Sequence, residues 1–179
     1  MAAVKSVIQE TQSKFGYIKG KSMWAKVLEP GEFGKFEVNL YPDEDTLNDF
    51  IAEMELLRGD AENEVKEAGK KISGLADVFK EDNDGNRYIA FKLNESNYKG
   101  EPNKVDFYDV TGSKVPDWDT MIGNGSLIKV KYMAKPYYMA STKMVGISYK
   151  FFAVQVIKLE EYAGADDGFG DETSSDEPF

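Results

Sequence analysis

Short segments in which apolar and polar residues alternate recur along most of this chain, separated by turns rich in glycine, aspartate and proline. Phe36, Val38 and Leu40, for example, alternate with polar residues and would share one face of a strand. Strands are predicted at 15–19, 25–28, 33–41, 105–110, 127–134 and 147–159, with a hairpin over 76–92 that turns at Asp84-Gly85. Five or more short strands are typical of a small closed or partly closed barrel, because closure hides the strand edges.

One segment has a different period. In residues 43–72 the apolar side chains recur at spacings of three and four, which is the pattern of an amphipathic helix. The acids that begin at Asp43 suit a helix N-terminus, and Lys70 and Lys71 suit its C-terminus. Gly59 makes a break or kink possible. We therefore predict a mostly β fold, a small barrel with one long inserted helix.

Charge is distributed unevenly along the sequence. The chain has 179 residues, with 32 Asp and Glu against 22 Lys and Arg, a net charge of −10. Residues 43–71 carry a net −6 and residues 160–179 a net −8, so the remainder is at +4. The final segment has no periodicity and is rich in Asp, Glu, Gly and Ser, which predicts a disordered tail. We therefore expect a domain over 1–161 and an acidic tail over 162–179.

Two residue types are missing altogether. The sequence contains no Cys and no His, which excludes disulfides, thiol nucleophiles, Cys or His zinc sites and imidazole bases. An enzyme would need carboxylate chemistry or a metal held by oxygen ligands. Asp106 and Asp109 would face opposite sides of one strand, and nothing supports Asp117 and Asp119 as a site. We therefore predict no catalytic residue, no metal and no cofactor.

Two loops resemble known binding loops only in part. Residues 81–85 are similar to a calcium loop, but Lys80 and Phe91 occupy the positions of the first and last ligands, which favours an ordinary hairpin turn. Gly123-Asn124-Gly125-Ser126 lacks the Gly-Lys-Ser/Thr of a phosphate loop and precedes a strand. A flexible connection is the favoured interpretation there.

Lysines interleaved with aromatic residues mark two segments, 17–26 and 129–143. A protein that binds single strands needs cations along the backbone and exposed rings on which unpaired bases stack. Trp24, Tyr137 and Tyr138 lie in polar, turn-like sequence, which favours exposure, although rings that cap the barrel core are the alternative. Rings within alternating strands are predicted to be core: Phe36, Phe91, Tyr132 and Phe151. The candidate DNA-binding residues are Tyr17, Lys19, Lys21, Trp24, Lys26, Tyr88, Lys92, Lys129, Lys131, Lys135, Tyr137, Tyr138 and Lys143.

The sequence resembles the replicative single-stranded-DNA-binding proteins of lytic phages of the T-odd type. The similarity is carried by 122–132, Pro136-Tyr137 and the strand that ends near Glu161, with weaker echoes at 17–19, 34–40 and 82–85. The resemblance implies an oligonucleotide-binding (OB) fold, a five-stranded Greek-key barrel with the helix between its second and third strands. It also implies an acidic tail that ends in phenylalanine and recruits enzymes of replication and recombination, with candidate residues Asp171, Glu172, Asp176, Glu177 and Phe179.

The leading hypothesis is a non-enzymatic protein that binds single-stranded DNA without sequence preference in replication, recombination or repair. Its protein partners would be a polymerase, helicase or nuclease. The resemblance also raises a homodimer formed through the tail, although this tail is shorter and less acidic than in the best-known members. Residues 1–15 carry no apolar signal segment and no run of about 18 apolar residues occurs, so we expect no membrane contact and a cytoplasmic location, in the host if the protein is phage-encoded. The rivals are an acidic protein-interaction module and, third, a carboxylate-metal nuclease.

Overall fold

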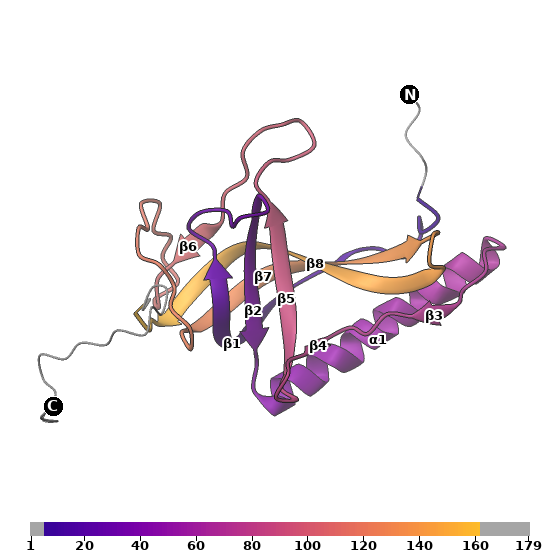
Figure 1. The fold of residues 1–179 in the computed structure, drawn as a ribbon, viewed down its shortest axis with the longest axis horizontal. Coiled ribbons are helices and arrows are strands. Elements are labelled where there is room, and N and C mark those ends of the chain that lie inside the picture. Colours follow the sequence, from indigo (N-terminus) through magenta and orange to yellow (C-terminus); the bar gives the residue numbers. More distant parts are fainter. Residues whose placement is uncertain (1–5, 162–179) are drawn as a thin grey trace, which may run out of the picture.

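Five strands form a mixed barrel in this computed structural model, which describes residues 6–161 (Figure 1). They are β1 (Lys14–Lys26), β2 (Lys35–Tyr41), β5 (Arg87–Asn94), β7 (Leu127–Met139) and β8 (Met144–Lys158). The pairs β5–β2, β2–β1, β1–β7 and β7–β8 are antiparallel, and the parallel pair β5–β8 closes the barrel at Lys92 and Lys150. The helix α1 (Glu44–Glu67) lies between β2 and β5. This order confirms the predicted OB architecture, with the helix between the second and third barrel strands.

Three short strands join the edges of this sheet. The strands β3 (Gly74–Leu75) and β6 (Asp106–Tyr108) both run parallel to β8, and β4 (Lys80–Glu81) forms a hairpin with β5. The turn of that hairpin contains Gly85 at a φ of 83°, as predicted for Asp84-Gly85. The segment predicted as a strand over 105–110 is shorter in the structure, because Asp109 begins a tight turn instead.

The barrel core follows the alternation predicted from the sequence. The four aromatic residues assigned to it are buried: Phe36, Phe91, Tyr132 and Phe151. The ring centroid of Phe91 lies 5.8 Å from that of Tyr132 and 5.9 Å from that of Tyr149. Burial raises the pKa of the Tyr132 phenol to about 12.

The helix α1 is continuous through Gly59, so no break occurs at this glycine. Asp43 caps the N-terminus by accepting a 2.8 Å hydrogen bond from the Thr46 N–H. The helix ends at Glu67, earlier than predicted, and Gly69 follows at a φ of 77°. Its apolar stripe packs against the barrel core and against the parts of β7 and β8 that extend beyond the barrel.

Two strand predictions were too short. Residues 15–19 and 25–28 were expected to be separate strands, but β1 runs through both segments as far as Lys26, with a register shift between Met23 and Lys26. Residues 135–139 were expected to be turn-like, but β7 continues to Met139 and β8 begins at Met144. The two strands thus form a long hairpin that extends beyond the barrel beside α1 (Figure 1).

A second, smaller core stabilises this hairpin extension. It contains Ile8, Ala61, Val65 and Val145. The N-terminal segment is fastened to α1 because the Glu64 carboxylate accepts hydrogen bonds from three successive backbone N–H groups, those of residues 9, 10 and 11. These bonds lower the pKa of Glu64 to about 2. One carboxylate therefore joins the start of the described chain to the C-terminal end of α1.

Candidate nucleic-acid interface

A groove of about 330 Å³ lies on the outer face of the barrel, across four adjacent strands. Strand β1 contributes Tyr17, β7 contributes Lys129 and Lys131, β8 contributes Ala153 and Gln155, and β6 contributes Tyr108, with Gly112 from the turn that follows. A tyrosine therefore lies toward each side of the groove, and two lysines lie between them.

Strand alternation and register bring these side chains together. Tyr17 lies opposite Lys131 and Lys19 opposite Lys129 across the β1–β7 ladder. Their neighbours Ile18 and Val130 are buried in the core, so the tyrosine and the lysines face outward. On the other side of β7, Lys129 lies opposite Gln155. The predicted residues Tyr17, Lys19, Lys129 and Lys131 are thus brought onto one face.

Tyr108 is held at the groove by local contacts of β6. It pairs with Gln155 of β8, whose side-chain amide donates a 3.2 Å hydrogen bond to the Asp109 carbonyl. The Asp109 carboxylate accepts bonds from Thr111 and Ser113 in the following turn, which lowers its pKa.

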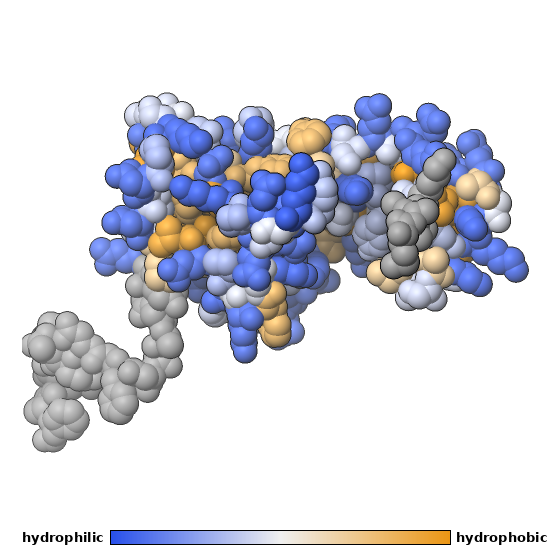
Figure 2. Space-filling view, turned by 90° about the horizontal axis from the view of Figure 1, so that it is seen from above, coloured by the Kyte–Doolittle hydropathy of each residue, from blue (hydrophilic) through white to orange (hydrophobic). Residues whose placement is uncertain are grey.

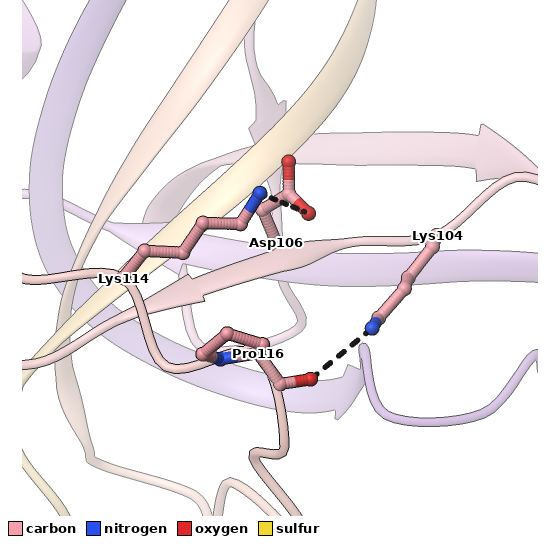
Figure 3. Close-up of polar contacts among 4 residues, drawn as sticks. All are labelled: Lys104, Asp106, Lys114 and Pro116. Carbon is pink, nitrogen blue, oxygen red and sulfur yellow. Dashed lines mark hydrogen bonds and ion pairs between the residues drawn. The ribbon is translucent and has the colours of Figure 1, made fainter.

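Two lysines connect the chain segments around β6: Lys114 contacts the strand itself, and Lys104 joins the segment before it to the segment after it. The Lys114 ammonium lies 3.6 Å from the Asp106 carboxylate, and the Lys104 ammonium donates a 3.2 Å hydrogen bond to the Pro116 carbonyl (Figure 3). Both contacts lie at the surface, so each is worth little alone. Together with the Asp109 turn they fix the strand that carries Tyr108.

An aromatic pair, exposed Phe15 on half-buried Phe152, continues the groove along the same face. The rings of Phe15 and Phe152 stack with centroids 6.3 Å apart, and the Lys150 ammonium lies 5.5 Å from the Phe152 centroid. Phe15 is 63% exposed and Tyr17 is 66% exposed. Large apolar side chains rarely remain so exposed in a cluster unless the surface binds something.

The sequence hypothesis missed Phe15, Tyr108, Lys150, Phe152 and Gln155. Phe15 could have been found, because it has the same strand parity as Tyr17 and Lys19. Phe152 follows the core residue Phe151 in an apolar run, and alternation requires one of the two to face outward. Tyr108 offers no comparable signal, since only the parallel pairing of β6 with β8 brings it to the groove.

The lysines of this face have no close ion-pair partner within the described part of the chain. None of these lysines forms an ion pair with another residue of 6–161: Lys19, Lys21, Lys129, Lys131 and Lys150.

Figure 2 shows apolar surface in two areas, one over the barrel and one over the end that carries the tip of the hairpin, each among hydrophilic side chains. Unpaired cations beside exposed rings are the combination expected of a surface for single-stranded nucleic acid.

Three predicted residues lie near the end of β1, outside the groove. Lys21 is exposed opposite Leu127. Trp24 is 66% exposed, as expected. It belongs to the irregular part of β1 at a φ of 54°, and its backbone N–H donates a hydrogen bond to the side-chain oxygen of Asn124. Lys26 lines a different cavity together with Glu29, Glu32 and Asp119, where a phosphate would be repelled.

The loop 123–126 supports this irregular part of β1. Backbone hydrogen bonds join Ser22 to Gly125 and Ser126, and the Gly123 N–H donates to the Glu160 carbonyl. A side chain at Gly123 would collide with the backbone of residues 160–161. The loop leads into β7, as expected of a connection, but these contacts hold it between β1 and the end of β8, so it is not the flexible segment that was expected.

The prediction that Tyr137 and Tyr138 lie in a turn was wrong. Both belong to β7 and are half-buried, and Tyr138 packs against the small core that contains Val145 of β8 with Ala61 and Val65 of α1. The Tyr138 hydroxyl donates a 2.6 Å hydrogen bond to the Lys71 carbonyl. Tyr137 packs over Gly146 and, with Lys92, lines a second cavity. Neither tyrosine lines the groove.

The remaining candidates are scattered. Lys135 is exposed on β7, and Lys143 lies in the turn between β7 and β8 at a φ of 56°. Tyr88 stacks on Tyr41 with centroids 5.2 Å apart. Burial and the hydrogen bond from its hydroxyl to Asp82 raise the pKa of Tyr41 to about 12. This pair lies over β2 and β5, away from the groove.

Several expectations concern other parts of the molecule. The tail residues Asp171, Glu172, Asp176, Glu177 and Phe179 lie outside the described residues. Within residues 6–161, no three acidic side chains are grouped so that they could hold a metal ion. In the same range, no helix is both long and apolar enough to cross a membrane.

Comparison with solved structures places this fold among phage proteins. The structure of gp2.5, a single-stranded-DNA-binding protein encoded by bacteriophage T7, superposes with a TM-score of 0.65 at 21% identity and covers 94% of this chain and 99% of that chain. The single-stranded-DNA-binding protein from bacteriophage Enc34 gives a TM-score of 0.55 at 17% identity and covers 89% of each chain. No protein-family model and no curated sequence gives a significant match. This chain therefore has the fold of phage single-stranded-DNA-binding proteins, as its resemblance had indicated.

Proposed function

We propose that this protein binds single-stranded DNA without sequence preference and is not an enzyme. The observation that carries the proposal is the groove in which Tyr17 and Tyr108 flank Lys129 and Lys131, with no ion pair to those lysines from residues 6–161. The two phage proteins of the same fold are named for the same activity. Its setting would be phage DNA replication, recombination or repair.

The mechanism follows from the two kinds of side chain in the groove. Unpaired bases stack on the exposed faces of Tyr17 and the Phe15–Phe152 pair, and each such contact is worth about 1–3 kcal/mol. The lysine ammonium groups neutralise phosphates and release counterions. Every base has an aromatic face, so this surface tolerates any sequence. A duplex has its bases stacked on one another and offers no free faces, so single strands are preferred.

The acidic tail supplies the second half of the proposal. Residues 160–179 carry a net −8, so the tail competes with DNA for the lysines of the groove, at an effective concentration of about millimolar for a short flexible tether. When DNA displaces it, Phe179 and its acidic neighbours are free to recruit a polymerase, helicase or nuclease. A homodimer would form by the same contact made between two copies.

Binding of a fluorescent oligonucleotide tests the first half. We expect saturable binding of single strands, much weaker binding of the duplex, and no cleavage product with or without Mg²⁺. Absence of binding would favour the rival, an acidic protein-interaction module, and Mg²⁺-dependent cleavage would favour a carboxylate-metal nuclease. Either result would overturn the proposal.

Two variants test the tail. Deletion of residues 165–179 should strengthen DNA binding at low salt, and the gain should shrink as salt screens the attraction. Phe179→Ala should leave DNA affinity unchanged, because no charge is removed, and should abolish capture of replication enzymes. The competition is refuted if the deletion does not alter affinity at low salt, and the recruitment is refuted if the Phe179 variant captures the same enzymes.

A further inference from the structure

A second cavity, of about 500 Å³, lies on the same outer face of the β7–β8 hairpin. It is located where the edge of β8 has no strand beside it. Leu75 of β3 pairs with Val145, and Lys92 of β5 pairs with Lys150, but among the described residues no strand pairs with this edge between those two positions. The backbone of residues 146–149 therefore borders an opening in the sheet.

The walls of this cavity combine rings with positive charge. Phe79, Tyr137 and Tyr149 contribute aromatic surface, and Lys80 and Lys92 are exposed at the opening. The Tyr149 hydroxyl donates a 2.7 Å hydrogen bond to the Val78 carbonyl, so this ring is fixed. A cavity of this size with a few polar groups at its opening is suited to a small planar ligand.

The charge balance of the cavity favours an anionic ligand. Asp77 is the acid among its lining residues, against Lys80 and Lys92. Arg58 of α1 adds a third cation beneath the wall, since its guanidinium donates a 2.7 Å hydrogen bond to the Ala76 carbonyl. Among the lining residues two lysines outweigh the single carboxylate, and Glu37, which lies opposite Lys92 across the β2–β5 ladder, does not line the cavity.

The two cavities lie along one strand. Lys131 of the groove and Tyr137 of the second cavity are six residues apart on β7 with the same parity, a distance of roughly 20 Å at about 3.3 Å per residue. The surface between them carries Lys135, Lys150 and the Phe15–Phe152 pair. Cations and rings thus continue from one cavity to the other without an intervening acid from these strands.

We infer that the cavity beside the open edge of β8 is a second nucleotide-binding subsite, occupied by a base of the same DNA strand that fills the groove. The inference rests on the proposed function and gives the strand a path along the β7–β8 hairpin. At about 3.4 Å per stacked nucleotide, roughly six nucleotides span the two cavities. The occupant is not an added peptide strand, because four unpaired residues are fewer than the 5–6 residues of a typical strand.

Oligothymidylates of two lengths test the inference on the full-length protein. A strand of about four nucleotides reaches one cavity and a strand of about 12 nucleotides reaches both, within the usual range for an OB fold. Lys80→Ala combined with Lys92→Ala should weaken binding of the long strand by on the order of tenfold, as expected for two lost phosphate contacts near 0.1 M salt. Binding of the short strand, which the groove retains, should be unchanged.

Matched controls separate this effect from charge and folding. Lys70→Ala with Lys71→Ala removes the same charge from residues that follow the C-terminus of α1, outside the cavity, and should leave both affinities unchanged. Tyr137→Leu keeps apolar packing on Gly146 but removes the ring, and should weaken the long strand at least about fivefold. Thermal unfolding of each variant must match the wild type.

Photocrosslinking gives an independent measurement. A long strand that contains 5-iodouracil should attach to wild-type peptides that carry Phe79 or Tyr137. The inference is overturned if crosslinks occur only at the groove, or if the Lys80/Lys92 variant binds the long strand as the wild type does while Tyr17→Ala weakens it. In both cases the proposed function stands. If the wild type binds neither strand, the proposed function itself fails.

Discussion

The two ends of the β7–β8 hairpin are made of the same strands but differ in which side chains are free to bind a ligand and which are packed against α1. At the barrel end, Tyr17, Lys129 and Lys131 project from the sheet with no ion pair inside residues 6–161. At the other end, α1 and the N-terminal segment cover the opposite face of the hairpin, where Tyr138 packs and hydrogen-bonds to the carbonyl of Lys71, just beyond the end of α1. Strand alternation alone therefore does not decide which side chains are free to bind, because the packing of a distant helix decides it.

The largest effect should come from the barrel core, which both ends depend on. Phe91→Ala should destabilise the protein by about 3–5 kcal/mol, since it removes a fully buried ring that touches Tyr132 and Tyr149. Urea unfolding measures the loss. The exposed ring of Phe15 provides the control, and Phe15→Ala should be nearly neutral for stability. A loss of similar size for both variants would show that the outer face belongs to the core.

Tyr17→Ala tests the free side chains of the barrel end. It should weaken single-strand binding by about 1–3 kcal/mol and leave thermal stability unchanged, because the ring is 66% exposed. Tyr98 is 92% exposed on a loop outside the groove, so Tyr98→Ala serves as the matched control. Equal losses of affinity for the two variants would remove the groove from the proposal.

Salt dependence examines the lysines at the same end. Each phosphate contact on a single strand contributes about −0.7 to the slope of log affinity against log salt. Lys129→Ala combined with Lys131→Ala should therefore reduce the magnitude of the slope by about 1.4, whereas the pair Lys70→Ala and Lys71→Ala should not alter it. Titrations at several salt concentrations give both slopes. An unchanged slope for the first pair would show that those lysines do not contact phosphates.

The smallest effect should come from the hairpin end, through Glu64. Its pKa is lowered to about 2, so its contribution to stability is complete above the unfolded value near 4.5 and is lost as the pH falls toward 2. Glu64→Gln should lower Tm by a few degrees at neutral pH, of order 5 °C or less, and the difference from wild type should close in acid. Glu67→Gln, on the same helix end, should not lower Tm.

Hydrogen exchange will show which region responds to the Glu64 variant. If the contact is local, protection should fall in residues 7–12 and the second half of α1 and stay constant in β5. Loss of protection across β5 as well would mean that the two ends unfold together, and the distinction between them would not hold.

Much of the barrel could be predicted from the sequence because its signals are local. Alternation in β2 and β5, the Asp84-Gly85 turn and the helical stripe of α1 each depend on residues within a few positions of one another. The same local rule placed Tyr17, Lys19, Lys129 and Lys131 on one face. Alternation fixes which side chains face outward on each of the two strands, so the strands needed only to be neighbours in the sheet.

The errors concern residues whose environment comes from distant parts of the chain. Pro136 and the polar residues around it indicated a turn, but Val145, Ala61 and Val65 form a core that favours continued strand pairing. Trp24 owes its position to Asn124, one hundred residues away along the chain. Tyr108 reaches the groove through a parallel pairing with β8. No window of neighbouring residues contains this information.

The hydrogen bonds from residues 9–11 to Glu64 have a practical consequence for handling the protein. They hold the start of the described residues at the hairpin end, whereas Glu160, bonded to Ser126, lies at the barrel end. Figure 1 shows these two ends of the described residues on opposite sides of the molecule. A dye, a surface linker or a fusion partner attached ahead of residue 6 would therefore be far from the groove. A group attached after residue 161 would instead start beside the strands that form the groove.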